Sequence, residues 1–211
     1  MKRILEIGGF IAGAVLVAFG VAIIVLGADG RSTVNSSLSQ EKIVGSSDMT
    51  PAGIKDEAAK AGLTDISLPS CSVAGKAITD GSSARCFAQY MRIHALESTG
   101  GLTYAQMGRF ATADGKPAGT NDAAKAVQKN GQPVTNSARD VWVTETALTT
   151  ALNVSYMATQ LSLFSIVIGV ALLLAGVGFA VLDWAALHKR REEAAAAEAV
   201  KPLPSSKPAV V

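Results

Sequence analysis

Charged side chains are scarce in this sequence, at 17% of 211 residues, and none occurs between Thr146 and Leu182. From residue 161 onward this uncharged stretch is apolar on every helical face. A bilayer core about 30 Å thick needs roughly 20 apolar residues in a helix, so residues 161–184 are predicted to span a membrane. No Gly or Pro interrupts 138–168. We therefore expect the helix to begin outside the membrane, with Ser137 as its N-cap and 138–160 as its outer half.

A strong net charge is also missing, because the formal charge is only +2. The segment 29–160 carries equal numbers of basic and acidic residues. A chain so balanced has no electrostatic footprint for nucleic acid and no polybasic surface for anionic lipid. The composition, with 49% hydrophobic residues, is typical of a membrane protein.

A second apolar run, 7–28, lies close to the N-terminus. The alternative interpretation is a cleaved signal peptide, whose apolar region usually has about 7–15 residues and ends in a small-x-small site. Here the run is longer, and Leu26 would occupy the third position before a cut after Ala28. An uncleaved transmembrane helix is therefore the preferred prediction.

The orientation follows from the basic residues that flank the two spans. Lys2 and Arg3 precede the first span, and the sequence His188-Lys189-Arg190-Arg191 follows the second. The positive-inside rule places both termini in the cytoplasm and the middle segment outside. The predicted layout is a cytoplasmic segment 1–6, a span 7–28, an extracytoplasmic domain 29–160, a span 161–184 and a cytoplasmic tail 185–211, disordered beyond about 200.

Small residues recur at a spacing of four in both spans, which lets helix backbones approach closely. These residues are Gly9 and Gly13 in the first span, and Ala171, Ala175, Gly176 and Ala180 in the second. We expect them to pack the spans on each other, with contacts between copies of the chain as the alternative. Trp184 and the basic Lys189, Arg190 and Arg191 are predicted to anchor the second span at the interface.

Only two cysteines occur, Cys71 and Cys86, and both lie in the predicted extracytoplasmic segment. Such a pair in an oxidising compartment predicts a disulfide. Neither the spacing of a redox pair nor a set of four metal ligands is present, so no metal site is expected.

Local patterns predict short helices in the same segment. Thr50-Pro51 opens one helix that ends before Gly62, a second covers Ser83 to Ser98, and a weak third covers 121–129. The second helix carries an apolar face with Phe87, Tyr90, Met91 and His94. We expect this face to pack on the long helix between 141 and 157. The long helix offers an apolar surface for it, made by Val143, Ala147, Val154, Met157 and Leu161.

The stretch 94–107, HALESTGGLTYAQM, resembles a motif of small actinobacterial membrane proteins with two spans. In these proteins a short extracytoplasmic helix leads into a Thr-rich helix that becomes the last span, as Thr144-Glu145-Thr146-Ala147-Leu148 does here. The resemblance implies architecture and no established activity. Its members often carry the label of an aromatic ring-opening dioxygenase.

Histidine is too scarce to support that label. The iron of such enzymes is typically held by two His and a carboxylate, and the two histidines here, His94 and His188, are predicted on opposite sides of the membrane. Catalytic motifs such as G-x-S-x-G, H-E-x-x-H and Walker A are also missing. A general base formed by His94 and Glu97 is the sharper hypothesis. The preferred one is a half-buried His94 against the long helix, bonded to a carbonyl or to Glu97.

The sequence thus predicts an all-α membrane protein with two transmembrane helices and a small disulfide-bonded helical domain outside. The expected function is a non-enzymatic scaffold or accessory subunit in the plasma membrane of a bacterial envelope. A sensor that signals to the tail is the alternative, and an enzyme is the least favoured. No catalytic residue, cofactor or metal is predicted. The expected partners are the lipid bilayer and either a membrane protein or a second copy.

Overall fold

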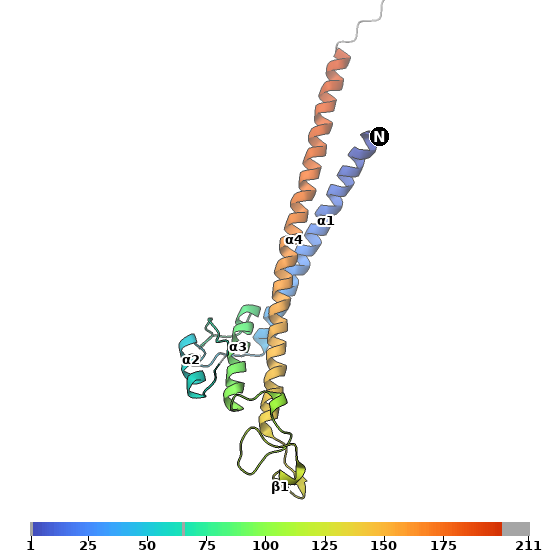
Figure 1. The fold of residues 1–211 in the computed structure, drawn as a ribbon. Helices are drawn as coiled ribbons and strands as arrows, with labels where there is room; N and C mark the ends of the chain where they lie inside the picture. The colour runs from blue at the N-terminus through green and yellow to red at the C-terminus, as the bar shows by residue number, and fades with distance from the viewer. Residues whose placement is uncertain (1, 65, 200–211) are drawn as a thin grey trace, which may run out of the picture. The chain divides into compact units, whose positions relative to one another are not determined.

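The computed structural model describes residues 2–64 and 66–199, and the described chain is mostly helical. In chain order, its elements are helices α1 (Lys2–Gln40), α2 (Pro51–Lys60) and α3 (Gly81–Ser98), the 3-10 turns Tyr104–Gln106 and Ala123–Lys125, strands β1 (Gln128–Lys129) and β2 (Gln132–Pro133), and helix α4 (Ser137–Ala199) (Figure 1). The all-α prediction is confirmed apart from the antiparallel β1–β2 pair. The predicted disorder beyond 200 lies outside the described residues.

Helices α1 and α4 are both long and apolar enough to cross a membrane. The most apolar 18-residue stretches of the two helices have mean hydropathies of 2.8 and 2.6, and only 11% of each stretch is buried within the protein. An apolar helix in the core of a soluble domain is instead mostly buried. The exposed apolar surface is therefore what a lipid-facing helix presents. The chain divides into two compact units, one of residues 1–27 and 164–211 and the other of residues 28–163.

In the first unit, glycines bring the backbones of α1 and α4 into direct contact. A Cβ added at Gly13 would lie 2.9 Å from the carbonyl oxygen of Gly176, and one at Gly20 would lie 2.7 Å from that of Gly169. These distances leave no room for a side chain, so glycine is required for this approach. On the opposite side of α4, a Cβ at Gly178 would meet nothing within 4 Å.

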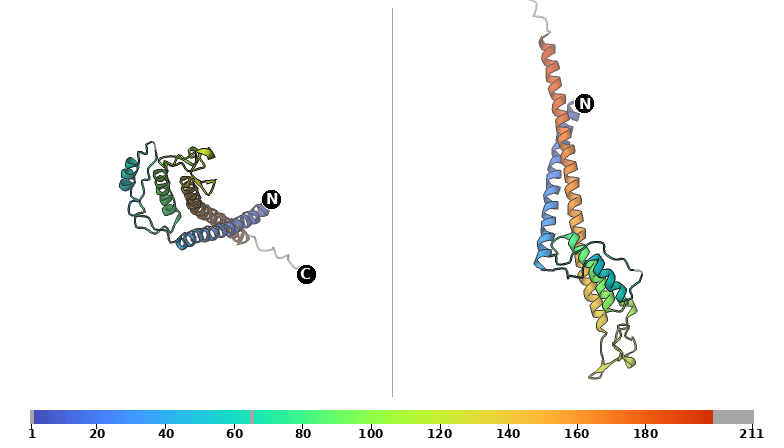
Figure 2. Two further views of the ribbon diagram at one scale, coloured as in Figure 1. Left: turned by 90° about the horizontal axis from the view of Figure 1, so that it is seen from below. Right: turned by 90° about the vertical axis from the view of Figure 1, so that its left-hand side faces the viewer.

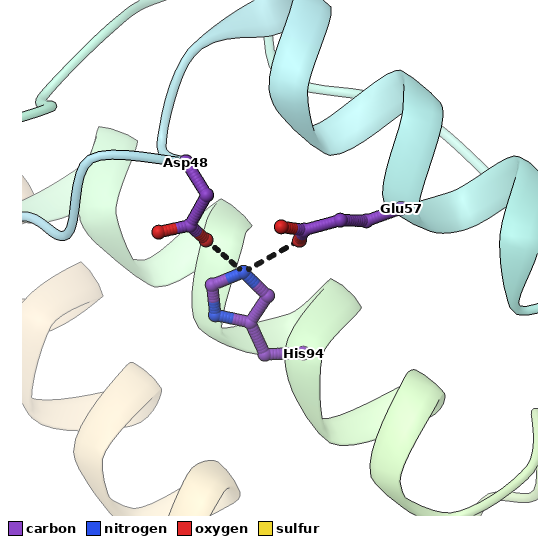
Figure 3. Close-up of side chains that lie close together, drawn as sticks. All are labelled: Asp48, Glu57 and His94. Atoms are coloured by element: carbon purple, nitrogen blue, oxygen red, sulfur yellow. Dashed lines mark ion pairs between the residues drawn. The ribbon is translucent and has the colours of Figure 1, made fainter.

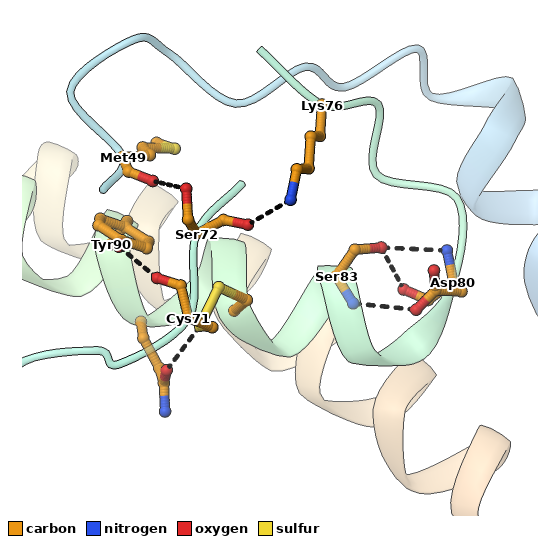
Figure 4. The surroundings of a disulfide bond; sticks show 9 residues. Met49, Cys71, Ser72, Lys76, Asp80, Ser83 and Tyr90 are labelled. Carbon is orange, nitrogen blue, oxygen red and sulfur yellow. Dashed lines mark hydrogen bonds between the residues drawn. A yellow bond between two sulfur atoms is a disulfide. The ribbon is translucent and has the colours of Figure 1, made fainter. Parts of the chain in front are cut away.

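In the second unit, α3 lies between α2 and α4, as both Figure 1 and Figure 2 show. The core joins α2 and α3 to the adjoining parts of α1 and α4. Its fully enclosed members include Ile54, Ile78 and Tyr90, with Leu38 and Leu152 contributed by the two long helices. The disulfide Cys71–Cys86 is confirmed, with its sulfurs 2.04 Å apart (Figure 4). It ties the loop before α3 to α3 itself.

The starts of the helices follow capping chemistry. Thr50 caps α2 as predicted, accepting a hydrogen bond from the Gly53 amide at 3.0 Å. Helix α3 begins two residues earlier than expected, because Asp80 forms a capping box with Ser83. Asn136 caps α4 and accepts from the Ala138 amide, so the prediction that Ser137 is the cap was wrong.

The weak helix predicted over 121–129 is also wrong. A single 3-10 turn is followed by a hairpin, in which Asn130 and Gly131 both have positive φ, at 53° and 73°. An Asn-Gly pair is the preferred sequence for a two-residue type I′ hairpin turn. The Asn136 side chain fixes two nearby loop segments, because its amide donates to the carbonyls of Gly108 and Pro117 at 3.0 and 2.8 Å.

Helix α3 does lie along the predicted part of α4, but on a different face of that helix. Arg92 stacks over the ring of Trp142 at 4.0 Å, and Gly81 lies against Tyr156 and Thr159. The face expected to receive α3 instead stays exposed. The exposed fractions are 54% for Val143, 56% for Val154, 68% for Met157 and 66% for Leu161. The predicted position along α4 is therefore confirmed, and only the choice of face was wrong, because apolar spacing alone does not say which of two faces a neighbouring helix covers.

Candidate functional site

Three ionisable side chains from separate segments of the second unit meet at one point, as Figure 3 shows. Asp48 comes from the turn before α2, Glu57 from α2 and His94 from α3. His94 Nε2 lies 2.9 Å from Asp48 Oδ2 and 3.3 Å from Glu57 Oε2. The side chains are 29–31% exposed, so the cluster lies near the surface and is still accessible to a solute. We call these three residues the His94 cluster.

Each member of the His94 cluster is positioned either by a hydrogen-bonded turn or by a helix of the second unit. Asp48 precedes the Thr50 cap of α2, and the adjacent Met49 carbonyl accepts hydrogen bonds from the amide of Val73 at 3.2 Å and the hydroxyl of Ser72 at 3.3 Å (Figure 4). Ser72 follows the disulfide-bonded Cys71, so the covalent bridge restrains this turn. Glu57 and His94 project from helices α2 and α3, which pack on each other through buried Ile54 and Tyr90.

The contacts of Asp48 favour the ionised form of its carboxylate. A hydrogen bond from the Ser46 side chain lowers the pKa of Asp48, and the nearby His94 lowers it further. Burial is the main reason that the pKa of Tyr90 is raised, with the negative charge of Asp48 as a further cause. Glu57 Oε2 and His94 Nε2 are buried atoms that make no hydrogen bond within the described residues.

The His94 cluster corrects the sequence prediction for His94. The ring bonds neither to a carbonyl nor to Glu97, because both partners are the acidic residues Asp48 and Glu57. These residues are far from His94 in the sequence, and no local motif brings them together. The only usable signal was that three potential ligands fell in one predicted domain. Chemically, two carboxylates and an imidazole nitrogen form a ligand set suited to a divalent metal.

A second polar feature lies between α3 and α4. Glu145 is only 5% exposed, and its Oε2 pairs with Arg92 Nη1 at 3.5 Å, while Oε1 has no hydrogen-bond partner in the described chain. Beside it is a cavity of about 500 Å³. Its polar lining includes Arg85, Gln89, Arg92, Glu145, Thr149 and Asn153.

The predicted small residues are divided between two faces of α4. Gly176 and Ala180 face α1, where both lie close to Gly13. Ala171 and Ala175 are instead exposed. Gly9 has a different neighbour, because a Cβ there would lie 2.5 Å from a carboxylate oxygen of Asp183. Asp183 belongs to none of the motifs predicted from the sequence, and its Oδ2 is buried with no hydrogen-bond partner among the described residues.

The predicted interfacial anchors lie in the last part of α4. Trp184 is 66% exposed, and its ring lies 5.5 Å from that of His188. Lys189 and Arg191 are exposed as well. Comparison of the chain with protein-family models, curated proteins and solved structures finds no match.

Proposed function

We propose that this protein is a non-enzymatic integral membrane scaffold of a bacterial cell envelope, which spans the plasma membrane twice and associates with itself. Both termini would lie in the cytoplasm, and residues 29–160 would lie outside. The two apolar helices and the basic residues at their cytoplasmic ends support this topology. The scaffold role is supported by one observation in particular, an exposed apolar stripe on the outer part of α4.

The stripe consists of residues spaced alternately by four and three along α4. It is made by Val143, Ala147, Thr150, Val154 and Met157, all of which are exposed. This spacing is that of the a and d positions of a heptad repeat, which line the seam of a coiled coil. The opposite face of α4 is already covered by α3, through Trp142 and Leu152. A second helix can therefore reach the stripe without displacing the domain.

The stripe lies in a region where water would surround it. Gly30 lies beside Ser162, with a Cβ at Gly30 only 2.9 Å from the Ser162 hydroxyl. The residues flanking Gly30 are Asp29 and Arg31, whose charges favour the membrane boundary. The stripe, from 143 to 157, is on the domain side of this level. When a partner covers exposed apolar side chains there, the free energy of the protein in water is lowered.

The partner that fits the stripe best is a second copy of the chain. Two copies inserted with the same topology present parallel α4 helices, and identical heptads then meet in register. The positions flanking the seam, Thr144, Thr146, Ala151 and Asn153, carry no charge. Two identical helices would therefore not repel each other along this seam, and no charge pattern selects a different partner.

Cysteine cross-linking tests this proposal directly. The described chain has no free thiol, so Val154→Cys introduces one reactive site on the stripe. Mild oxidation of membranes containing this variant is expected to yield a covalent homodimer. Leu148→Cys is the matched control, because Leu148 is 46% exposed on the same helix but lies about 140° around it from the centre of the stripe.

The mass of the product cross-linked through Val154→Cys distinguishes a second copy of the chain from a different partner protein. A product with twice the mass of the chain, absent from the Leu148 variant, supports the self-associating scaffold. Cross-linking to a different protein would make the chain an accessory subunit of another complex. Equal homodimer yields from the two variants would indicate random collision and contradict the seam.

A sensor that reports to the cytoplasmic tail is the second candidate function. The polar cavity beside Glu145 favours it, because a buried carboxylate oxygen and two nearby arginines suit a ligand with both charges. Under this hypothesis a ligand would protect the amides of α3 from hydrogen exchange. The scaffold hypothesis expects no such protection.

A further inference from the structure

We propose that Asp48, Glu57 and His94 bind a divalent transition metal of the zinc type, through Oδ2, Oε2 and Nε2. This inference is independent of the scaffold function, since none of the three residues belongs to the apolar stripe on α4. The three ligand atoms come from the turn before α2, from α2 and from α3. A metal held by all three would join these segments across the surface of the domain.

The spacing of the ligand atoms fits a metal. All three lie within 4.8 Å of one another, and the two nitrogen–oxygen distances are 2.9 and 3.3 Å. Zinc binds nitrogen and oxygen ligands at about 2.0–2.2 Å, which puts tetrahedral ligands roughly 3.4 Å apart. Small side-chain movements would bring the three atoms to that geometry. One tetrahedral position would remain for water.

The direction from which the two carboxylates approach His94 favours a metal ion at Nε2 over a doubly protonated imidazole. A doubly protonated imidazole has an N–H on each nitrogen, and two carboxylates are best accommodated with one at each. Here both carboxylates approach Nε2, while the other ring nitrogen points elsewhere (Figure 3). The contact with Glu57 is not a hydrogen bond, since Glu57 Oε2 is buried and has no such partner within the described residues. A cation bound at Nε2 accounts for this convergence, because it attracts both oxygens to the same point.

The cluster is also held in place before any metal binds. The turn carrying Asp48 is restrained by Ser72 and Val73, which follow the Cys71–Cys86 bridge. Helices α2 and α3 are capped by Thr50 and Asp80. A site whose ligands are positioned by capped helices loses less conformational freedom on binding.

The experiment uses the full-length chain in detergent, purified through a tag without histidine and stripped with EDTA. After dialysis against Zn²⁺ at neutral pH, elemental analysis is expected to find one zinc per chain. Added Zn²⁺ should also raise the melting temperature of the domain, whereas Mg²⁺ should not, because magnesium prefers an all-oxygen octahedral shell. Absence of bound zinc in the wild-type chain would overturn the proposal.

Matched variants locate the metal. Glu57→Gln removes a carboxylate of the cluster, and Asp56→Asn removes the neighbouring exposed carboxylate of α2, which lies outside it. We expect Glu57→Gln to weaken zinc binding about tenfold or more, since even indirect partners of metal ligands contribute about that much. Asp56→Asn should bind zinc as the wild type does. Equal loss in both variants would contradict the assignment.

The two histidines provide a test that needs no variant. Diethyl pyrocarbonate modifies accessible imidazole nitrogens, and the chain contains only His94 and His188. Zinc is expected to protect His94 and to leave His188 reactive, as measured by mass spectrometry of the peptides. If zinc protected both histidines or neither, the ion would be bound elsewhere or not at all, and the proposal would be wrong.

Discussion

Replacing Tyr90 with alanine is expected to destabilise the second unit by about 3–5 kcal/mol, the usual loss for an aromatic side chain in a packed core. Tyr90 is fully buried, at 0% exposure, and its hydroxyl donates to the Cys71 carbonyl at 2.6 Å. Its removal would leave both a cavity and an unpaired carbonyl. The effect is measured in the full-length chain by thermal unfolding, with hydrogen exchange of the α3 amides as the probe of the second unit.

Two control variants divide the effect of Tyr90 into its parts. Tyr90→Phe keeps the ring and is expected to lose about 0.5–1.5 kcal/mol, the net contribution of one hydrogen bond. Tyr104→Ala removes a ring that is 42% exposed and should have the smaller effect. If Tyr90→Ala were no worse than Tyr104→Ala, the assignment of the core would be wrong.

The raised pKa of Tyr90 adds a pH dependence with a definite sign. A group whose pKa is higher in the folded state stabilises the fold fully below its unfolded value, here 10.0, and this contribution is lost as the pH rises through the folded pKa. The wild-type domain should therefore lose stability above about pH 10 through this group. Tyr90→Phe should lack that component.

Replacing Gly20 with valine is expected to force α1 away from α4 in the first unit. An added Cβ would lie 2.7 Å from the Gly169 carbonyl oxygen and 2.8 Å from the Leu173 nitrogen. These are backbone atoms, which cannot rotate aside as a flexible side chain can. Overpacking of this kind typically destabilises by about 1–3 kcal/mol, and here the two helices would separate.

The measurement for Gly20→Val is a spin-label distance between Ile11 on α1 and Leu182 on α4, whose side chains are 55% and 68% exposed. The distance should increase in Gly20→Val. Gly178→Val is the control, because a Cβ at Gly178 meets nothing within 4 Å, and it should leave the distance unchanged. An unchanged distance in both variants would contradict the close glycine contact.

Features with a strong local or compositional signal could be predicted from the sequence. The two long apolar helices follow from uninterrupted runs of apolar residues, and the disulfide follows from a lone pair of cysteines. The start of α2 was predicted correctly because Thr50-Pro51 satisfies capping chemistry by itself. Each of these signals needs only neighbouring residues or a simple count.

Features that depend on tertiary contacts were missed. The Asp48, Glu57 and His94 side chains are brought together only by the packing of α2 on α3. The covered face of α4 could not be chosen either, since Trp142 and Leu152 on one side compete with Val143 and Val154 on the other. The hairpin at Asn130-Gly131 was missed for a different reason, because its local turn signal was outweighed by a weak helical pattern.

The proposed topology, with two spans and the middle segment outside, can be measured by thiol labelling of intact bacterial cells. Lys116→Cys lies in the middle segment, where the Lys116 side chain is 75% exposed. Glu193→Cys lies near the end of α4, at an exposed position. With a membrane-impermeant maleimide, the thiol at 116 is expected to react in intact cells and the thiol at 193 only after permeabilisation. Labelling of 193 in intact cells, or of 116 only after permeabilisation, would contradict the topology.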